Sequence, residues 1–203
     1  MESLRPRRTS YTDYLAAEHA SQRRHEFLDG VIVAMAGGSD EHNAIAGRFA
    51  MLLGNRETGA CRYYTADQRF WIPAQRRGRY ADGSIIRGAP VHPTHDDQAT
   101  TNPTIVLEVL SPSSQGDDDG DKRGDFQSLA SLEAYVLVAQ DLRRVKVYRR
   151  VAGEWQATTY QDGDRFELPT LAAPIAVAEI YDRILDRAGA SLLRSLLSSP
   201  RAR

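Results

Sequence analysis

The sequence predicts an α/β (α+β) domain, in which a mixed central β-sheet is flanked by helices and extended by an antiparallel meander. The β-branched apolar run 104–110 lies between Asn102-Pro103 and Ser111-Pro112, as is typical of a strand buried on both faces. Apolar residues at helical spacing occur before and after this run. In the last third of the chain, short alternating segments separated by glycine turns predict the meander.

Size and composition favour one globular domain, residues 10–185. The chain has 203 residues, of which 41% are hydrophobic and 26% charged. We expect residues 1–9 to form a disordered arm and residues 186–203 a weakly specified tail. The formal net charge of -1 excludes a generally basic nucleic-acid binder, so any such contact needs a local patch.

Several common classes of protein are excluded by absent motifs. Cys61 is the single cysteine, which excludes a disulfide framework and a Cys-rich zinc site and suits the reducing cytoplasm. The first residues lack the apolar stretch of a secretory signal, and no run approaches the roughly 18 apolar residues of a membrane span. GxxxxGK[ST], GxGxxG and GxSxG motifs are missing. We therefore expect a cytoplasmic protein without a membrane segment.

The first elements have clear local signals. Ser10 and Asp13 form a capping pair for a helix that ends near Ala20. The segment HEFLDGVIVAM predicts two short strands joined by the turn Asp29-Gly30. Ser39 then predicts the N-cap of a helix with one apolar face, which consists of Ile45, Phe49, Leu52 and Leu53.

The middle of the chain predicts strands at residues 61–72 and 80–86, with Asp82 near the start of the second. Between them lies a basic turn, which we interpret as an exposed hairpin tip in preference to a phosphate-binding surface; it contains Arg76, Arg77 and Arg79. Residues 87–103 form a predicted solvated loop. Its HxxHD pattern, from His92 to Asp96, is a weaker candidate for a metal site because no helix aligns the two imidazoles.

The remaining elements follow the central strand. Residues 134–138 predict another buried strand. The meander is predicted from strands at 144–149, 155–160 and 166–168, and a closing helix at 177–185.

Glu108 interrupts the apolar run 104–110 with a single charge. A carboxylate removed from water must protonate, pair with a cation or bind a metal. Further acidic groups converge on the exit of this strand, namely Asp117, Asp118, Asp119 and Asp121.

Lys122 falls in the first turn of the helix that follows, where a cation is unfavourable unless an anion faces it. It precedes Phe126 by four residues and therefore shares the apolar face of the helix and points inward. The chain has only two lysines, Lys122 and Lys146, among 26 basic residues, which suggests that a compact amine is needed.

Asp82, Glu108 and Lys122 together suggest phosphodiester chemistry. Mg²⁺ is held by one or two carboxylates with waters and substrate oxygens, and a nearby amine can stabilise charge on a phosphate or orient the attacking water. Glu26 is either a solvated strand carboxylate or an accessory group. His42 lies near a helix N-terminus, where it can meet a phosphate or a carboxylate, although a structural histidine is the commoner case there.

Five segments of the chain are distinctive, namely SYTDYLAAEHA, RHEFLDGVIVAMAGGSDEHNAIAG, NPTIVLEVLSPSS, DKRGDF and LEAYVLV. Together they resemble the Uma-type family of restriction-endonuclease-like proteins in the PD-(D/E)XK nuclease superfamily, and the resemblance covers residues 10–181. It implies a restriction-endonuclease-like core. It also implies that Asp82 is the motif aspartate, that Glu108 is the second carboxylate and that the lysine has moved from position 110 to Lys122.

The resemblance further implies that Glu26, His42 and Asp118 occupy accessory positions. Ala81 departs from the proline that precedes the motif aspartate, and Ala139 stands where an aspartate is expected. The main hypothesis is a Mg²⁺- or Mn²⁺-dependent endonuclease that acts on nucleic acid, in the first place DNA. Its metal ligands would be Asp82, Glu108 and the backbone carbonyl of Val109.

Two alternatives remain open: a catalytically inactive nuclease fold that acts as a binding protein or scaffold, and a metal-dependent hydrolase of another phosphate ester. Analogy with restriction-like nucleases suggests a homodimer.

Overall fold

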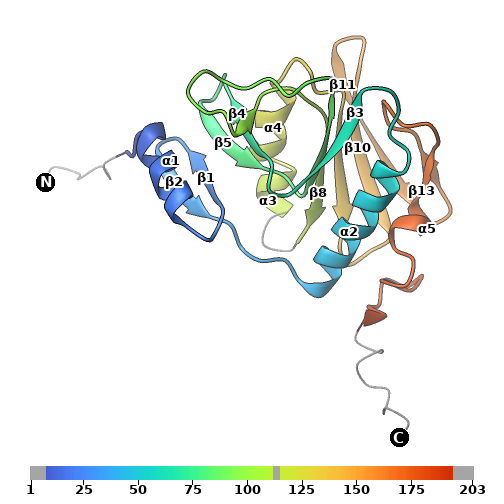
Figure 1. The fold of residues 1–203 in the computed structure, drawn as a ribbon. Coiled ribbons are helices and arrows are strands. Elements are labelled where there is room, and N and C mark those ends of the chain that lie inside the picture. Colours follow the sequence, from blue (N-terminus) through green and yellow to red (C-terminus); the bar gives the residue numbers. More distant parts are fainter. Residues whose placement is uncertain (1–7, 112–114, 194–203) are drawn as a thin grey trace, which may run out of the picture.

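The computed structural model describes residues 8–111 and 115–193, which form two mixed sheets with few helices (Figure 1). The larger sheet has the strand order β11-β10-β9-β8-β6-β3. Its members are β3 (Cys61–Thr65), β6 (Gly83–Arg87), β8 (Pro103–Leu110), β9 (Ala134–Ala139), β10 (Arg144–Val151) and β11 (Glu154–Gln161). β8 and β9 are parallel and the other neighbours are antiparallel. The predicted mixed central sheet and its meander are therefore confirmed.

A second sheet, of five strands, was not predicted. Its order is β2-β1-β5-β4-β7. It comprises β1 (His25–Leu28), β2 (Val31–Ala34), β4 (Arg69–Ile72), β5 (Arg77–Tyr80) and β7 (Ala99–Thr100). The hairpin of β1 and β2 turns through Asp29 and Gly30, both at positive φ, as a two-residue turn of this sequence requires.

Two predicted strands are each divided between the sheets. Residues 61–72 form β3 in the large sheet and β4 in the small one, separated by a turn. Residues 80–86 divide at Ala81-Asp82, where the chain passes from β5 to β6. The sequence pattern indicates which residues favour β-structure, but it does not indicate which sheet they join. The predictions of one strand at 61–72 and one at 80–86 were therefore wrong. Asp82 consequently lies at the crossing between the sheets.

The helices at the start of the chain begin where their caps predict. The Ser10 and Ser39 hydroxyls accept hydrogen bonds from the amides of Asp13 and His42, both at 3.1 Å. The helices are α1 (Tyr11–Ala20), α2 (Asp40–Gly54), α3 (Gln115–Asp118), α4 (Asp121–Gln127) and α5 (Val177–Ile180). The predicted closing helix at 177–185 is thus limited to four residues. It follows a small two-stranded sheet of β12 (Arg165–Phe166) and β13 (Ile175–Ala176).

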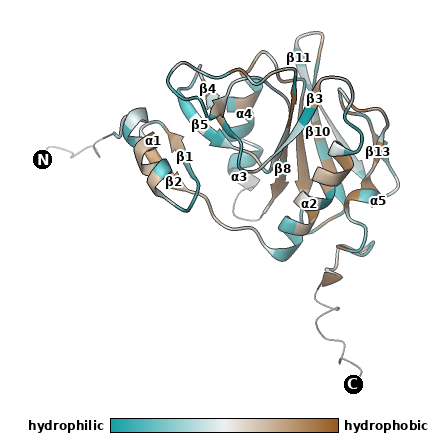
Figure 2. Ribbon diagram, viewed as in Figure 1, coloured by the Kyte–Doolittle hydropathy of each residue, from teal (hydrophilic) through white to brown (hydrophobic). Residues whose placement is uncertain are grey.

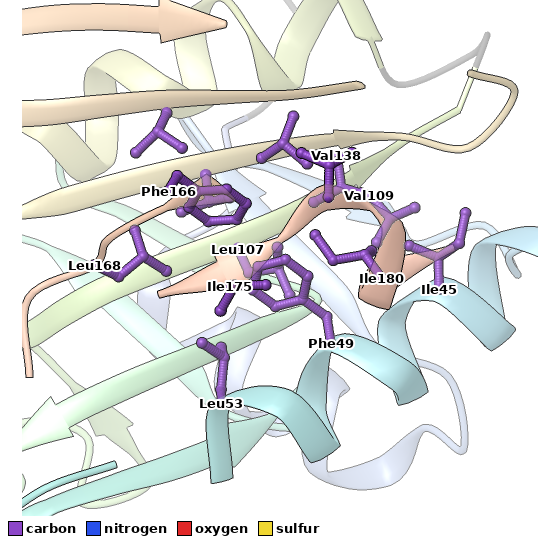
Figure 3. Close-up of a cluster of buried hydrophobic side chains, with 14 of the residues drawn as sticks. Ile45, Phe49, Leu53, Leu107, Val109, Val138, Phe166, Leu168, Ile175 and Ile180 are labelled. Carbon is purple, nitrogen blue, oxygen red and sulfur yellow. The ribbon is translucent and has the colours of Figure 1, made fainter. Parts of the chain in front are cut away.

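The central strands β8 and β9 of the large sheet are buried on both faces. On one face α2 packs through Ile45, Phe49 and Leu53, as Figure 3 shows, against Leu107 and Val109 of β8. On the other face lies a cluster that joins α4 and β4 to β8 and β9; it includes Phe70, Phe126, Val106 and Leu137. Figure 2 shows β8 as a hydrophobic strand between these layers. Burial of each large apolar side chain contributes about 1.5–3 kcal/mol, so β8 is firmly held.

Most of the predicted arm and much of the predicted tail lie outside the described residues. Within them, the Thr9 amide donates to the Gly30 carbonyl at 2.8 Å, and the Leu192 amide donates to the Ile184 carbonyl at 2.8 Å. In the described part of the chain, no helix has the length and apolar character needed to cross a membrane.

Candidate functional site

Glu108 and Lys122 meet in the interior, as predicted. Side chains alternate along β8, so Glu108 shares the face of Val106 and points toward α4. Lys122 is 7% exposed and points inward one turn before Phe126, which anchors α4 in the core. The Lys122 Nζ lies 2.9 Å from the Glu108 Oε1. The lysine therefore has the anion that its position in the first turn of a helix requires.

Two more carboxylates lie close to the same ammonium. The Lys122 Nζ is 3.4 Å from Asp118 Oδ1 on α3 and 3.9 Å from Glu26 Oε1 on β1. Burial alone would lower the pKa of Lys122, but Glu108, Glu26 and Asp118 outweigh it and raise that pKa. Lys122 is thus a protonated cation. Glu26 is buried, which favours the accessory role over a solvated strand carboxylate.

Negative charge exceeds positive charge around Glu108, whose side chain is 3% exposed. Burial raises the pKa of Glu108 well above its usual range. Lys122 opposes this increase, whereas the charges of Asp118 and Asp82 add to it. Glu26 is also paired with Arg79, but Arg79 binds Asp117 and Asp125 as well. The acids therefore still outnumber the cations, and the cluster favours uptake of a proton or of a further cation.

Asp82 lies beside this cluster and is connected to it by the backbone of β8. Its Oδ2 accepts a hydrogen bond from the Val109 amide at 2.7 Å and lies 3.1 Å from His42 Nε2. Burial would raise the pKa of Asp82, but His42 and the Val109 amide reverse the direction and lower it. The hydrogen bond to Asp82 raises the pKa of His42. The two side chains therefore form an ion pair when His42 is protonated.

The Val109 carbonyl also belongs to this part of the site. The pairing of β6 with β8 ends at Gly83 and Leu107. Beyond this pair, the Val109 amide of β8 donates its hydrogen bond to the Asp82 side chain and not to the backbone of β6. In a strand, the N–H and C=O of one residue point to the same side. The carbonyl of Val109 therefore faces the side on which Asp82 lies, as its predicted metal role requires.

Tyr63 is a neighbour of Asp82 that the sequence analysis missed. A Cβ at position 83 would collide with the Tyr63 hydroxyl, so Gly83 is needed for the close approach of this ring. Burial and the charge of Asp82 raise the pKa of Tyr63 to about 12. The hydroxyl is therefore neutral and remains a potential donor. Nothing in the local sequence distinguishes Tyr63 from other strand tyrosines.

The prediction of an exposed hairpin tip is confirmed for Arg76, which lies in the turn that joins the antiparallel strands β4 and β5. It is wrong for Arg79, which is only 1% exposed. Its guanidinium donates to Glu26 at 2.8 Å, to Asp125 at 2.8 Å and to Asp117 at 3.0 Å. Arg79 thus connects β1 to α3 and α4, the elements that carry Asp118 and Lys122. The prediction was wrong because the acidic partners of this arginine are remote in sequence.

Arg77 belongs to the same network and binds Asp125 and Asp29. Its spacing of two from Arg79 on one strand is the local signal that both side chains share a face.

The predicted solvated loop at 87–103 contains a buried ion pair. Asp96 is 6% exposed and receives two hydrogen bonds from Arg69, at 2.9 and 2.8 Å. The prediction was therefore wrong for this residue. Residues 99–100 of the same loop form β7.

Across the described residues, no group of three or more His, Cys, Asp or Glu side chains is arranged to hold a metal ion. Mg²⁺ does not require such a group, because it keeps several waters and is bound by one or two carboxylates with substrate oxygens. Asp82, Glu108 and the Val109 carbonyl offer only hard oxygen ligands. The surplus of negative charge near Lys122 also favours a further cation. The residues present fit a hard divalent ion.

The mixed sheet, together with buried acids and a lysine at the exit of its central strand, defines a protein with a restriction-endonuclease-like core. The chain belongs to the Uma2 family, described as "Putative restriction endonuclease", whose model matches residues 11–178.

Two uncharacterized proteins of Synechocystis are similar to it. One is 31% identical over 77% of this chain and 89% of its own, and the other 32% identical over 83% and 89%. A crystal structure from Anabaena variabilis, of "a putative nuclease belonging to DUF820", shares the fold with a TM-score of 0.63. It is 14% identical and covers 79% of this chain and 91% of its own.

Proposed function

We propose that this protein is a Mg²⁺- or Mn²⁺-dependent endonuclease that hydrolyses phosphodiester bonds in DNA. The observation that carries the proposal is the meeting of Glu108 and Lys122 in a buried, acid-rich cluster, with Asp82 joined to the same strand one residue further on. These side chains come from three separate parts of the chain. Their residue types match those that phosphodiester hydrolysis with a hard cation requires.

In this proposal Asp82, Glu108 and the Val109 carbonyl hold the metal ion. When bound, such an ion stabilises charge on phosphate oxygens and increases the acidity of a coordinated water. Glu108 must be ionised to act as a ligand, so metal affinity should rise with pH.

Lys122 acts as an electrostatic group and not as a general base. Its raised pKa keeps the amine protonated, so it has no lone pair with which to accept a proton from water. A fixed ammonium beside the scissile phosphate stabilises the charge that develops in the transition state. Glu26 and Asp118 hold this ammonium in place, and His42 orients Asp82.

Cleavage of supercoiled plasmid DNA in Mg²⁺ tests the proposal. Wild type should convert the plasmid to nicked and linear forms, whereas Asp82→Asn, Glu108→Gln and Lys122→Met should each lower the rate by about 10²-fold or more. Asp121→Asn is a matched control, because Asp121 is exposed and precedes Lys122 on the same helix. Equal cleavage by every variant would indicate a contaminating nuclease, and absence of cleavage on DNA and RNA would contradict catalysis.

A non-enzymatic scaffold is the second candidate. It is favoured by the existing pairing of Glu108 with Lys122 and by the lack of a larger ligand group among the described residues. Thermal unfolding in increasing Mn²⁺ separates the two. Binding to the native state stabilises the enzyme by about 2.7 kcal/mol when the free ion is at 100 times its Kd. The scaffold should show no shift beyond that of an Asp82→Asn, Glu108→Gln double variant.

The proposal also includes a cytoplasmic location and a homodimer. A free thiol at buried Cys61 suits a reducing compartment. Two subunits would present two sites to the two strands of a duplex, and sedimentation equilibrium with and without DNA tests this assembly.

A further inference from the structure

A protein with a net charge of -1 needs a local basic patch to hold a polyanion. The basic turn contributes little, because Arg77 and Arg79 are each paired with two or more acids and only Arg76 of the three arginines is exposed. Another basic region surrounds a cavity of about 290 Å³ beside the ends of β8 and β9. Its lining includes Leu110, Leu137, Ala139, Asp119, Arg144 and Lys146.

Strand register places this cavity next to the candidate site. Glu108 pairs with Leu137, and Leu137 pairs with Lys146, so the three residues form one row across β8, β9 and β10. Neighbouring strands are about 4.8 Å apart, which puts the backbone of Lys146 about 10 Å from that of Glu108. Val145 and Val147 are buried on the α2 face, so Lys146 projects from the α4 face, as Glu108 does. The cavity therefore lies on the same face of the sheet as the candidate site, and its lining includes Leu110, two residues after Glu108.

The charges around the cavity are mainly positive. Asp119 accepts hydrogen bonds from Lys146 at 2.8 Å and from the Tyr148 hydroxyl at 2.6 Å, and it lies 3.4 Å from Arg123. Arg144 is exposed and has no ion-pair partner among the described residues. Two cations, Arg144 and Lys146, and one acid thus line the cavity, and Arg123 pairs with that acid from outside the lining. The other lining residues are apolar or carry a hydroxyl, so an entering anion would meet little repulsion.

We propose that this cavity binds a backbone phosphate of the nucleic-acid strand whose scissile phosphate lies at Lys122. The inference rests on the proposed function and adds to it the residues that hold the substrate. Arg144 supplies a guanidinium that can bind a phosphate through two hydrogen bonds. Lys146 supplies a point charge, which the paired carboxylate of Asp119 partly offsets. These contacts fix the position of the strand and carry no base specificity.

Salt-dependent binding of a fluorescently labelled DNA duplex tests the inference without cleavage. Anisotropy is measured in EDTA between 50 and 200 mM KCl for wild type, Arg144→Ala and Lys146→Met. Each lost phosphate contact should reduce the slope of log K against log salt by about 0.9. Arg62→Ala is the control, because Arg62 is exposed on β3, the opposite edge of the large sheet.

Asp119→Asn provides a second variant with the opposite expected effect. Removal of the acid leaves the cations unopposed, so duplex affinity should increase several-fold, which a folding defect would not produce. Unchanged slopes in the Arg144 and Lys146 variants would overturn the inference, even if plasmid cleavage is intact. Lack of any salt-dependent binding by wild type would overturn it as well. Altered slopes in a protein that never cleaves would support the phosphate site and contradict only the nuclease proposal.

Discussion

Two buried ion clusters in this molecule differ in charge balance. In the first, Arg69 binds Asp96 through two hydrogen bonds, and Asp96 also accepts from the Tyr11 hydroxyl and from the amides of Gln98 and Ala99. In the second, the ammonium of Lys122 lies among three carboxylates, of which Glu26 is also paired with Arg79. The first cluster is neutral and joins α1, β4 and the loop before β7. The second has unbalanced negative charge.

The acids in the two clusters respond in opposite directions. Burial would raise the pKa of Asp96, but Arg69 and Tyr11 outweigh it, so that this pKa is lowered. Burial raises the pKa of Glu108, and Lys122 reverses only part of the increase. A satisfied cluster therefore contributes to stability, whereas an unsatisfied one has the capacity to take up another cation. Burial of charged groups does not by itself distinguish the two.

The largest effect is expected from loss of the balanced pair. Asp96→Ala leaves the Arg69 guanidinium buried without its carboxylate, which should lower the free energy of unfolding by about 3–5 kcal/mol. Urea unfolding measures the change. Asp97→Ala, at the exposed neighbouring position, should stay within about 0.5 kcal/mol of wild type. Equal stability of both variants would remove the distinction between the clusters.

Loss of an acid from the unbalanced cluster should separate stability from activity. Glu108→Gln removes a carboxyl whose charge is disfavoured in the folded state, so the free energy of unfolding at pH 7 should not fall. Plasmid cleavage should nevertheless fall by about 10²-fold or more. A destabilisation as large as that of Asp96→Ala would show that Glu108 has a structural role like that of Asp96.

The pH dependence of unfolding should have opposite signs for the two acids. The lowered pKa of Asp96 gives stability that is present above 3.8 and is lost as pH falls through the folded-state value. For Glu108, whose pKa is raised on folding, the contribution to folding stability is fully present below pH 4.5 and is lost as pH rises toward the folded-state pKa. The cost of Asp96→Ala should therefore shrink in acid, and Glu108→Gln should become relatively more stable as pH rises. Urea titrations from pH 3 to 8 measure both, and parallel profiles would contradict the assignment.

His42 should have the smallest effect, because it acts through Asp82. His42→Asn is expected to raise the Mg²⁺ concentration for half-maximal cleavage by about tenfold, as is typical for the loss of a group that orients a metal ligand. His19→Asn on the exposed face of α1 is the control. An unchanged metal requirement would show that the His42 side chain has no part in positioning Asp82 for a metal ion.

Local signals predicted much of the fold. Serine caps, the Asp29-Gly30 turn and the apolar run of β8 depend on neighbours in the chain, and each was confirmed. The pairing of Glu108 with Lys122 was also predictable. A carboxylate in a buried strand and a cation in the first turn of a helix are each unfavourable without a partner of opposite charge. The burial of Arg79 was not predictable, because its partners Asp125 and Glu26 are 46 and 53 residues away. The second sheet was not predicted for a similar reason, because it pairs strands that are far apart in the chain, such as β1 and β5.

The sequence by itself determined the elements, the buried central strand and the two charged residues that require each other inside the core. Turn geometry, helix capping and side-chain periodicity depend on residues that are close in the chain, so they can be predicted from the sequence. Only the tertiary structure decided that the strands within residues 61–86 belong to two different sheets and that Arg79 is buried. It also decided that Glu26 and Asp118 lie near the same Lys122 ammonium as Glu108. Charge balance depends on distances between residues from different elements, and those distances exist only after the chain has packed.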